Sequence, residues 1–487
     1  MHDVVIIGGG VVGSTIARTL AKYELDVCVV EKGSDVAVGS TKANSGIVHA
    51  GYDAKPGTLK AKFNVMGQKL FDRAAEELKF PFKRCGSLVV AFDEDSIDKL
   101  YDLKSRGEKN GVYGLRVIDG ETLRKMEPNM SEGICGALDV PSGGIVCPYE
   151  MTIAYAENAA ENGVRFFFNT EVLHVSKRAG YFDINTSGGM LQARVVINAA
   201  GIHADEINNM VSENKLEITP RKGEYCVLDK TEGKIVSRTI FQLPTVMGKG
   251  VLITPTVDGN LLVGPTSEPI DDKEDVSTSR EGLDEVLKKG GLDLKHMPEG
   301  KVITSYSGLR PHPSNDDFII GEAEDAPGFI NAAGIESPGL TSAPAIALEI
   351  EMVTVSILRP AEKKGYNPRR DAKPHFRHMT DEERELAIKY NPDFGKIICR
   401  CETVSKAEII AALRSPLGIR DLDAIKRRTR AGMGRCQSGF CNMRLLDIVA
   451  EELDIPITGV TKFGHNSQLL IEKNKTAFMR GGEVSKT

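Results

Sequence analysis

One stretch near the start of the chain decides how the protein folds: Val4-Val5-Ile6-Ile7-Gly8-Gly9-Gly10-Val11-Val12-Gly13. Its first four residues are apolar and β-branched, and they have the length of a buried strand. A helix is expected over 14–22 and a second apolar strand over 27–30, after which comes Glu31. The glycines form the pattern G-x-G-x-x-G, with its fixed positions at Gly8, Gly10 and Gly13. This order of strand, glycine turn, helix, strand and acid predicts a dinucleotide-binding unit.

Each part of this unit has a role toward a bound dinucleotide. The first glycine permits the tight turn, the second lets backbone N–H groups approach a pyrophosphate, and the third lets helix and strand pack closely. Glu31 is expected to accept hydrogen bonds from an adenosine ribose, and its neighbour Lys32 is expected to line the same site. A glycine-rich strand–helix turn without a ligand is the alternative.

The composition excludes several classes of protein. Of 487 residues, 41% are hydrophobic and 27% are charged, which is typical of soluble proteins with about three domains. The net charge of −6 predicts no attraction to nucleic acid or acidic membranes. No apolar run reaches the roughly 18 residues of a transmembrane helix, so none is expected. Because the chain enters a strand without a signal-peptide core, we expect a cytoplasmic protein, for which peripheral membrane contact and an oligomeric state stay open.

Further segments with small or hydroxyl-bearing side chains let the backbone close around a cofactor. One spans 39–51. Two others echo each other, VINAAG at 196–201 and FINAAG at 329–334, and a fourth, 336–341, opens a predicted helix. For the echo, two buried strands with small residues for packing are the alternative. We expect the cofactor to contact Thr41, Asn44, Ser45, Ala200, Gly201, Gly334, Gly339, Leu340 and Thr341, together with Val172.

The rest of the pattern predicts an α/β protein with insertions. Loosely alternating strands over 82–92 and 134–146, with a helix between them, leave the dinucleotide unit, and more strands lie between the two echoes. We therefore expect a discontinuous Rossmann-like domain, an inserted mixed-sheet substrate-binding domain and a small α-rich C-terminal domain. The boundaries are 1–80, 150–215 and 325–358 for the first domain, 81–149 and 216–324 for the second, 359–378 for a linker, and 379–487 for the third domain and its tail.

Four of the nine cysteines form two close pairs near the C-terminal end, C-x-C and C-x4-C. Four thiolates brought together favour a soft metal centre. Zinc usually prefers C-x2-C pairs, whereas a [2Fe–2S] cluster is held by four cysteines. The basic stretch 426–435 would stabilise a negatively charged cluster, and nucleic-acid binding there is less favoured because no aromatic residues interleave. We expect an iron–sulfur cluster, with zinc and disulfides as alternatives, at Cys399, Cys401, Cys436 and Cys441.

The residues up to about 360 resemble the flavin-dependent, D-amino-acid-oxidase-like superfamily, and within it the short bacterial glycerol-3-phosphate oxidases and dehydrogenases. The resemblance is carried by KANSGIVH at 42–49, RKGEY at 221–225, GKGV at 248–251, GNLLVGPT at 259–266 and SPGLT at 337–341. KPGTLKAK at 55–62 also looks like L-2-hydroxyglutarate dehydrogenases, which share the fold. The resemblance implies that the dinucleotide is FAD and that the first domain is an FAD-binding one.

The C-terminal part resembles the small [2Fe–2S] domain related to bacterioferritin-associated ferredoxin. A similar domain ends the large subunit of the anaerobic glycerol-3-phosphate dehydrogenases, whereas the short oxidases lack it. The resemblance therefore implies an electron acceptor other than oxygen. We expect an electron-accepting partner, either a subunit or a flavoprotein.

The resemblance implies roles only for those residues of this chain that match the motifs of the family. His49 resembles the histidine that takes the hydroxyl proton, and Ser337 matches a serine beside the flavin. Arg310 and Lys249 match basic residues at the anionic end of the substrate. Longer glycerol-3-phosphate dehydrogenases carry an arginine shortly after the histidine, but here the sequence continues AGYD over 50–53. The phosphate must therefore be held otherwise.

The leading hypothesis is an FAD-dependent dehydrogenase that oxidises a small anionic substrate, sn-glycerol 3-phosphate, to dihydroxyacetone phosphate. The hydride would pass to flavin N5, and electrons would leave through the [2Fe–2S] cluster to the partner. Oxidation of an L-2-hydroxy acid such as L-2-hydroxyglutarate is the second hypothesis, and an amino-acid dehydrogenase or oxidase is the third. An electron-transfer subunit whose flavin is reduced by a partner is an alternative from another class.

Overall fold

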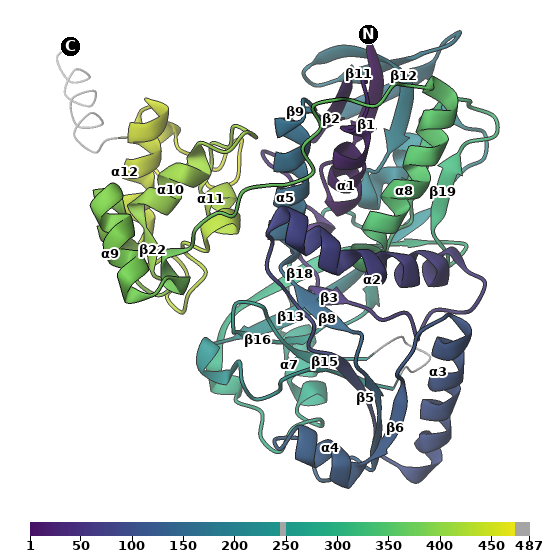
Figure 1. The fold of residues 1–487 in the computed structure, drawn as a ribbon, viewed down its shortest axis with the longest axis vertical. Coiled ribbons are helices and arrows are strands. Elements are labelled where there is room, and N and C mark those ends of the chain that lie inside the picture. The colour runs from purple at the N-terminus through teal and green to yellow at the C-terminus, as the bar shows by residue number, and fades with distance from the viewer. Residues whose placement is uncertain (244–249, 473–487) are drawn as a thin grey trace, which may run out of the picture. The chain divides into compact units, whose positions relative to one another are not determined.

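The computed structural model describes residues 1–243 and 250–472. The chain divides into two compact units: the first contains residues 1–32 and 36–372, and the second contains 33–35 and the residues from 373 onward. The division after residue 372 falls inside the predicted linker 359–378. Figure 1 shows that the first unit is α/β and the second is mostly helical, which confirms the predicted fold class.

The first unit is built on a sheet that contains the glycine turn. Its strand order is β10-β11-β12-β1-β2-β9, and β20 pairs with β12 and with β19 (Figure 1). The strands around β1 are parallel, and β10, β11 and β12 form antiparallel pairs. The bounds are β1 (His2–Ile7), β2 (Val27–Val30), β9 (Arg165–Phe167), β10 (Val172–Lys177), β11 (Phe182–Thr186), β12 (Gly189–Asn198), β19 (Ile319–Glu322) and β20 (Phe329–Ala333).

The two echoed segments lie side by side in this sheet. β12 and β20 pair in parallel, with Val196 opposite Phe329 and Asn198 opposite Asn331. The side-chain amide of Asn198 donates a hydrogen bond of 2.9 Å from Nδ2 to Oδ1 of the Asn331 side chain. The repeat is therefore a pair of adjacent buried strands whose carboxyl ends meet at one edge of the sheet, where α/β proteins bind ligands.

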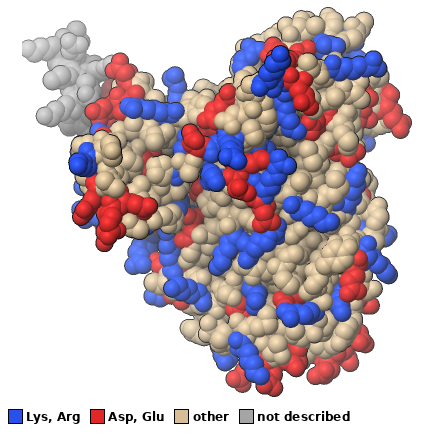
Figure 2. Space-filling model, viewed as in Figure 1, with Lys and Arg blue, Asp and Glu red and all other residues tan. Residues whose placement is uncertain are grey.

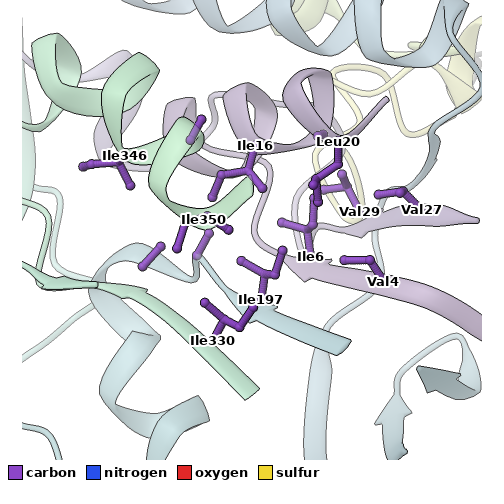
Figure 3. Close-up of a cluster of buried hydrophobic side chains, with 14 of the residues drawn as sticks. Val4, Ile6, Ile16, Leu20, Val27, Val29, Ile197, Ile330, Ile346 and Ile350 are labelled. Atoms are coloured by element: carbon purple, nitrogen blue, oxygen red, sulfur yellow. The ribbon is translucent and has the colours of Figure 1, made fainter. Parts of the chain in front are cut away.

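Helices α1 (Val11–Leu20), α2 (Leu59–Leu78), α5 (Pro148–Glu161) and α8 (Gly339–Leu358) belong to this part of the unit. α1 begins three residues before the predicted start at residue 14, because Thr41 Oγ1 accepts a 3.0 Å hydrogen bond from the Val11 N–H. Figure 3 shows Ile16 and Leu20 of α1 and Ile346 and Ile350 of α8 above the sheet. Their side chains pack in one core cluster with those of Val4, Ile6, Val27, Val29, Ile197 and Ile330.

α8 is long and apolar enough to cross a membrane by length and composition, which the sequence did not lead us to expect. Its contacts indicate a different role. It packs against α1 and α2, and Ala345, Ile346 and Ile350 are fully buried in the core cluster. We interpret α8 as a core helix.

A second, mainly antiparallel sheet has the order β17-β13-β16-β15-β14-β5-β7-β6, and β18 pairs with β13. The predicted strand over 82–92 is split between this sheet and a small third sheet, β3-β8-β4, and so is the stretch 134–146. β6 and α4 were not predicted. The bounds are β3 (Ile47–Val48), β4 (Phe82–Lys83), β5 (Ser87–Ala91), β6 (Arg116–Asp119), β7 (Gly136–Val140), β8 (Gly144–Val146), β13 (Ile218–Leu228), β14 (Thr239–Gln242), β15 (Leu252–Pro255), β16 (Leu261–Gly264), β17 (Glu268–Pro269) and β18 (Val302–Pro313).

The helices that accompany these two sheets are α3 (Ile97–Lys109), α4 (Gly120–Met126) and α7 (Arg280–Gly290), whereas α6 (Ala204–Val211) contacts β10, β12 and β20 of the first sheet. β19 joins the first sheet although it lies within 216–324, the segment assigned to the substrate-binding domain. The division of the first unit into an FAD-binding and a substrate-binding domain stays a prediction.

The second unit contains α9 (Asp381–Tyr390), α10 (Lys406–Leu413), α11 (Leu422–Thr429) and α12 (Asn442–Leu453), with the short strands β21 (Ile397–Cys399) and β22 (Val404–Ser405). Thr380 and Ser405 form capping boxes with Glu383 and Glu408. These local signals satisfy the first N–H groups of α9 and α10.

The charged side chains on the face of the first unit that Figure 2 shows are mixed in sign. Lysines and arginines lie among aspartates and glutamates over this face. Such a surface lacks the single-sign patch that attracts nucleic acid. The absence of nucleic-acid binding stays a prediction.

Asp293, after α7, offers a test of how burial affects stability. It is fully buried, Gln242 Nε2 donates to Oδ1 at 3.3 Å, and Oδ2 has no hydrogen-bond partner among the described residues. Burial raises the pKa of Asp293 from 3.8 to about 8, against the hydrogen bond from Gln242. The folded state therefore holds this proton where the unfolded state releases it, and stability is lost as pH rises from about 4 to about 8.

We expect the substitution Asp293→Asn to remove this loss of folding stability at rising pH. The variant and the wild type should have similar melting temperatures near pH 4, and the variant should be more stable at about pH 8.5, by several kcal/mol at most because each pKa unit is worth about 1.4 kcal/mol. Calorimetry over this pH range measures the difference. An equal dependence of both melting temperatures on pH would contradict the assignment.

Candidate active site

The glycine turn closes against the end of β12. Gly8 has a φ of +106°, which favours glycine, and a Cβ at this position would overlap the carbonyl oxygen of Ala199. A Cβ at Gly13 would overlap the carbonyl oxygen of Gly8. Both glycines are therefore required by close backbone approach, which brings the start of α1 to the sheet edge.

The start of α1 has the features of an anion site. Gly10 is its N-cap residue, and no acidic residue lies in its first turn. Glu31, which is largely buried, accepts a hydrogen bond of 2.7 Å from the Gly9 N–H. The glycine turn thus holds Glu31 beside a helix N-terminus, which attracts the negative charge of a pyrophosphate.

A cavity of about 910 Å³ extends from this turn into the space between the first two sheets. Eight predicted residues do not line it: Gly8, Gly13, Glu31, Lys32, Val172, Ala200, Gly334 and Thr341. Lys32 instead pairs with Glu274 at 2.7 Å. The predicted residues that line the cavity are Gly10, Thr41, Asn44, Ser45, His49, Gly201, Arg310, Ser337, Gly339 and Leu340.

His49 follows β3 and is held through its backbone. Its N–H donates to Thr341 Oγ1 at 2.9 Å, and its carbonyl oxygen accepts from Asn64 Nδ2 at 2.7 Å. Its Nε2 lies 3.4 Å from Ser337 Oγ, and its ring lies against Phe241 with centroids 5.8 Å apart. The fold thus presents a half-buried imidazole and a hydroxyl together on the cavity wall. Thr341 does not line the cavity but holds the backbone of His49 through this hydrogen bond.

Arg310 lies on β18. Its Nη2 donates to the Thr266 carbonyl oxygen at 2.9 Å, and its Nη1 lies 3.4 Å from Ser267 Oγ. Gly223, on the neighbouring strand, leaves room for the guanidinium, because a Cβ there would overlap Nη2. Lys249, the other predicted anion ligand, lies outside the described residues.

Sequence reasoning missed several polar residues of the cavity wall. Arg221 lines the cavity, as do Lys60 and Glu336, whose charged groups lie 2.9 Å apart. Burial raises the pKa of Glu336, but the charge of Lys60 and the hydrogen bonds from Lys60 and His312 outweigh it, so the pKa lies below its ordinary value. Arg221 and Lys60 occur inside the family-like stretches 221–225 and 55–62, but no local pattern indicates that they meet one cavity.

The four predicted cluster ligands come together within the second unit. Cys399 ends β21, Cys441 precedes α12, and Cys401 Sγ lies 3.6 Å from Cys436 Sγ. A hydrogen bond from Cys441 lowers the pKa of Cys399, and this effect is larger than the increase in pKa that burial causes.

The backbone around these thiols also suits a cluster. The N–H groups of Gly432 and Glu402 lower the pKa of Cys399 further. A Cβ at Gly434 would overlap the Cβ of Cys401. Four thiols with inward-pointing N–H groups fit a [2Fe–2S] cluster, whose sulfurs accept such hydrogen bonds.

The basic stretch 426–435 is partly neutralised within this unit. Buried Arg430 pairs with buried Glu402 at 2.8 Å, and Arg377 lies 3.4 Å from the same carboxylate. Part of the positive charge of the stretch is therefore paired with a buried carboxylate.

Comparisons with known proteins give a family for each of the two parts of the chain. Residues 3–351 match the model of the FAD dependent oxidoreductase family, and residues 397–451 match that of the BFD-like [2Fe-2S] binding domain. The glycerol 3-phosphate dehydrogenase of Caloramator mitchellensis is 49% identical over 477 residues, which are 98% of this chain and 99% of that protein. The glycerol 3-phosphate oxidase of Mycoplasma pneumoniae is 34% identical over 360 residues, which are 72% of this chain and 93% of that protein.

A solved structure is also similar. Dithionite-reduced L-alpha-glycerophosphate oxidase from Mycoplasma pneumoniae, with FAD bound, superposes with a TM-score of 0.72 at 33% identity. The match covers 76% of this chain and 98% of that one. The chain is a flavin-dependent redox enzyme that also has an iron–sulfur domain. It belongs to the FAD dependent oxidoreductase family, with FAD and a [2Fe–2S] cluster as its cofactors.

The packing of Gly434 against Cys401 predicts a selective loss of the cluster. Gly434→Ala should displace Cys401 and lower the content of iron and acid-labile sulfide, while the FAD content stays at the wild-type level. Metal analysis and the visible absorption spectrum measure both. Gly459→Ala is the control, because a Cβ there has its nearest neighbour at 3.7 Å. A full complement of iron in Gly434→Ala would contradict the packing argument.

Proposed function

We propose that this protein oxidises sn-glycerol 3-phosphate to dihydroxyacetone phosphate and passes the electrons through its [2Fe–2S] domain to a partner, in the cytoplasm. One observation carries the proposal. His49, Ser337 and Arg310 line one cavity, which begins at the glycine turn. A proton acceptor and a cation thus face the space that a small anionic alcohol would occupy. Relatives whose names contain glycerol 3-phosphate support this substrate class.

The residues of the chain have separate roles in the proposed reaction. Arg310 offers a planar fork of N–H donors to the anionic end of the substrate. His49 takes the hydroxyl proton on Nε2, which lies 3.4 Å from Ser337 Oγ. Imidazole suits this role near neutral pH. When bound, FAD supplies at N5 the acceptor for the hydride that leaves the carbinol carbon, so that the C–O bond becomes a carbonyl.

The proposal is tested by anaerobic reduction of the purified enzyme. Glycerol 3-phosphate should bleach the flavin absorption of the wild type, with dihydroxyacetone phosphate as the product. The His49→Ala variant should keep its FAD, but its flavin should be reduced more slowly by orders of magnitude. The reason is that a general base raises the reaction rate by about 10²–10⁴-fold. Stopped-flow absorbance measures the rates.

Three outcomes would contradict parts of this proposal. Bleaching by L-2-hydroxyglutarate and not by glycerol 3-phosphate would show that the substrate is a hydroxy acid. Bleaching by neither would favour an amine substrate or a flavin that a partner reduces. An unchanged rate in His49→Ala would remove His49 from the mechanism.

The surface around the cysteines supports the electron-accepting partner. A [2Fe–2S] cluster, when bound, transfers one electron at a time, and Cys401 is exposed. Phe440 and Met443 are 87% and 54% exposed although they are apolar.

The charge around these side chains is positive. Within the described residues, neither Arg400 nor Arg444 has a carboxylate partner, and the sequence has no acidic residue between Asp423 and Asp447. Apolar side chains among cations fit an acidic one-electron carrier protein.

This surface predicts a charge preference. With glycerol 3-phosphate as reductant, the enzyme should reduce the acidic cytochrome b5 faster than the basic cytochrome c, and salt should slow the acidic pair. Arg444→Glu should lower kcat/KM for cytochrome b5 and leave flavin bleaching unchanged. Equal rates for both cytochromes, or for both enzyme forms, would contradict an acidic partner at this surface.

A further inference from the structure

A pair of arginines faces the cavity from neighbouring strands. Arg221 of β13 and Arg310 of β18 lie directly opposite each other in the antiparallel ladder. Opposite residues of such a ladder point to the same face of the sheet, with Cβ atoms about 5 Å apart. Both arginines are half-buried and line the cavity. Like charges placed in this way repel each other unless an anion lies between them or near them.

The protein does not supply that anion from its own carboxylates. Arg310 donates to the Thr266 carbonyl oxygen and to Ser267 Oγ, and Arg221 Nη2 lies 2.7 Å from His312 Nε2. None of these partners is a carboxylate. Among the described residues, neither guanidinium has a carboxylate partner.

The nearby carboxylates of the wall are engaged elsewhere. Glu336 pairs with Lys60 at 2.9 Å, and Asp316 pairs with the same ammonium group at 3.1 Å. Asp317 accepts hydrogen bonds from the first N–H groups of α2, those of Leu59 and Lys60. Two guanidinium charges therefore remain for a ligand.

A short chain of hydrogen bonds holds Arg221 in this position. Glu336 Oε1 lies 2.9 Å from His312 Nδ1, and His312 Nε2 lies 2.7 Å from Arg221 Nη2. Because a carboxylate only accepts, we assign the ring proton to Nδ1, which leaves Nε2 to accept from the guanidinium. Lys60 in turn fixes Glu336. The side chain of Arg221 is thus oriented by groups that do not themselves need to touch the substrate.

We propose that Arg221 and Arg310 together bind the dianionic phosphate end of the substrate, and that His312 and Glu336 position Arg221. This inference rests on the proposed function and deepens it. It answers how the phosphate is held although the segment AGYD after His49 contains no arginine. Two forks can donate to several phosphate oxygens at once, whereas a carboxylate offers only two oxygens. The pair therefore favours a phosphate over a carboxylate.

The test compares binding with catalysis in the FAD-loaded full chain. Arg221→Met should raise the dissociation constant for glycerol 3-phosphate, and that for inorganic phosphate as a dead-end ligand, by about 10- to 100-fold, because a hydrogen bond to a charged group contributes about 1.5–3 kcal/mol. The limiting rate of flavin reduction should change little. Perturbation of the flavin spectrum reports phosphate binding, and stopped-flow reduction separates binding from rate.

Further variants keep the test decisive. Arg221→Lys should restore part of the affinity. His312→Phe should raise both dissociation constants by a smaller factor, since it removes only the positioning contact and leaves the FAD content unchanged. Arg280→Met, an exposed arginine of α7, is the control and should bind both ligands as the wild type does.

The outcomes separate the two proposals. Suppose that glycerol 3-phosphate reduces the wild type and that Arg221→Met binds phosphate and substrate with unchanged affinity. Phosphate binding by the arginine pair is then overturned, and the proposed function stands. If glycerol 3-phosphate does not reduce the wild type but Arg221→Met loses inorganic phosphate binding, the anion site is supported and the substrate assignment fails. A fall in the limiting rate with unchanged dissociation constants would also overturn the binding role.

Discussion

The structure depends on the close approach of two backbone segments, the turn after β1 and the end of β12. Gly8 takes a φ of +106° with no room for a side chain against Ala199. This contact fixes the direction of α1, whose N-terminus then lies at the sheet edge with Glu31 bonded to the Gly9 N–H. The cofactor region follows from these short-range constraints, because no bulkier residue allows the same approach.

The second constraint is the long ladder between β13 and β18. Their pairing runs from Ile218 opposite Pro313 to Leu228 opposite Val302. It places Arg221 beside Arg310 and leaves the space over Gly223 for the Arg310 guanidinium. The same two strands supply the stacked rings of Tyr225 and Tyr306, 4.9 Å apart. A single register thus determines the charge and the shape of one cavity wall.

Local signals predicted some elements well and others poorly. Apolar residues recur three and four positions apart over 59–78, which predicts a helix with the ends that α2 has, Leu59 and Leu78. The sequences 380–383 and 405–408 have the pattern of capping boxes, and α9 and α10 form them. The predicted start of α1 was wrong by three residues because Thr41, whose hydroxyl accepts the hydrogen bond from the first N–H group of the helix, lies thirty positions away from Val11. The stretch 82–92 contains strands of two different sheets, and its apolar alternation does not indicate which partner each half will pair with.

The sequence by itself determined the glycine turn, the acid after the second strand, the two echoes and the four cysteines, because each is a short pattern whose chemistry needs only near neighbours. The tertiary structure alone decided that the echoes pair with each other and that Ser337 lies beside His49. It also decided that Arg221 meets Arg310 and His312, about ninety residues further along the chain. Strand register sets these meetings, and register depends on the packing of whole sheets rather than on any local run of residues.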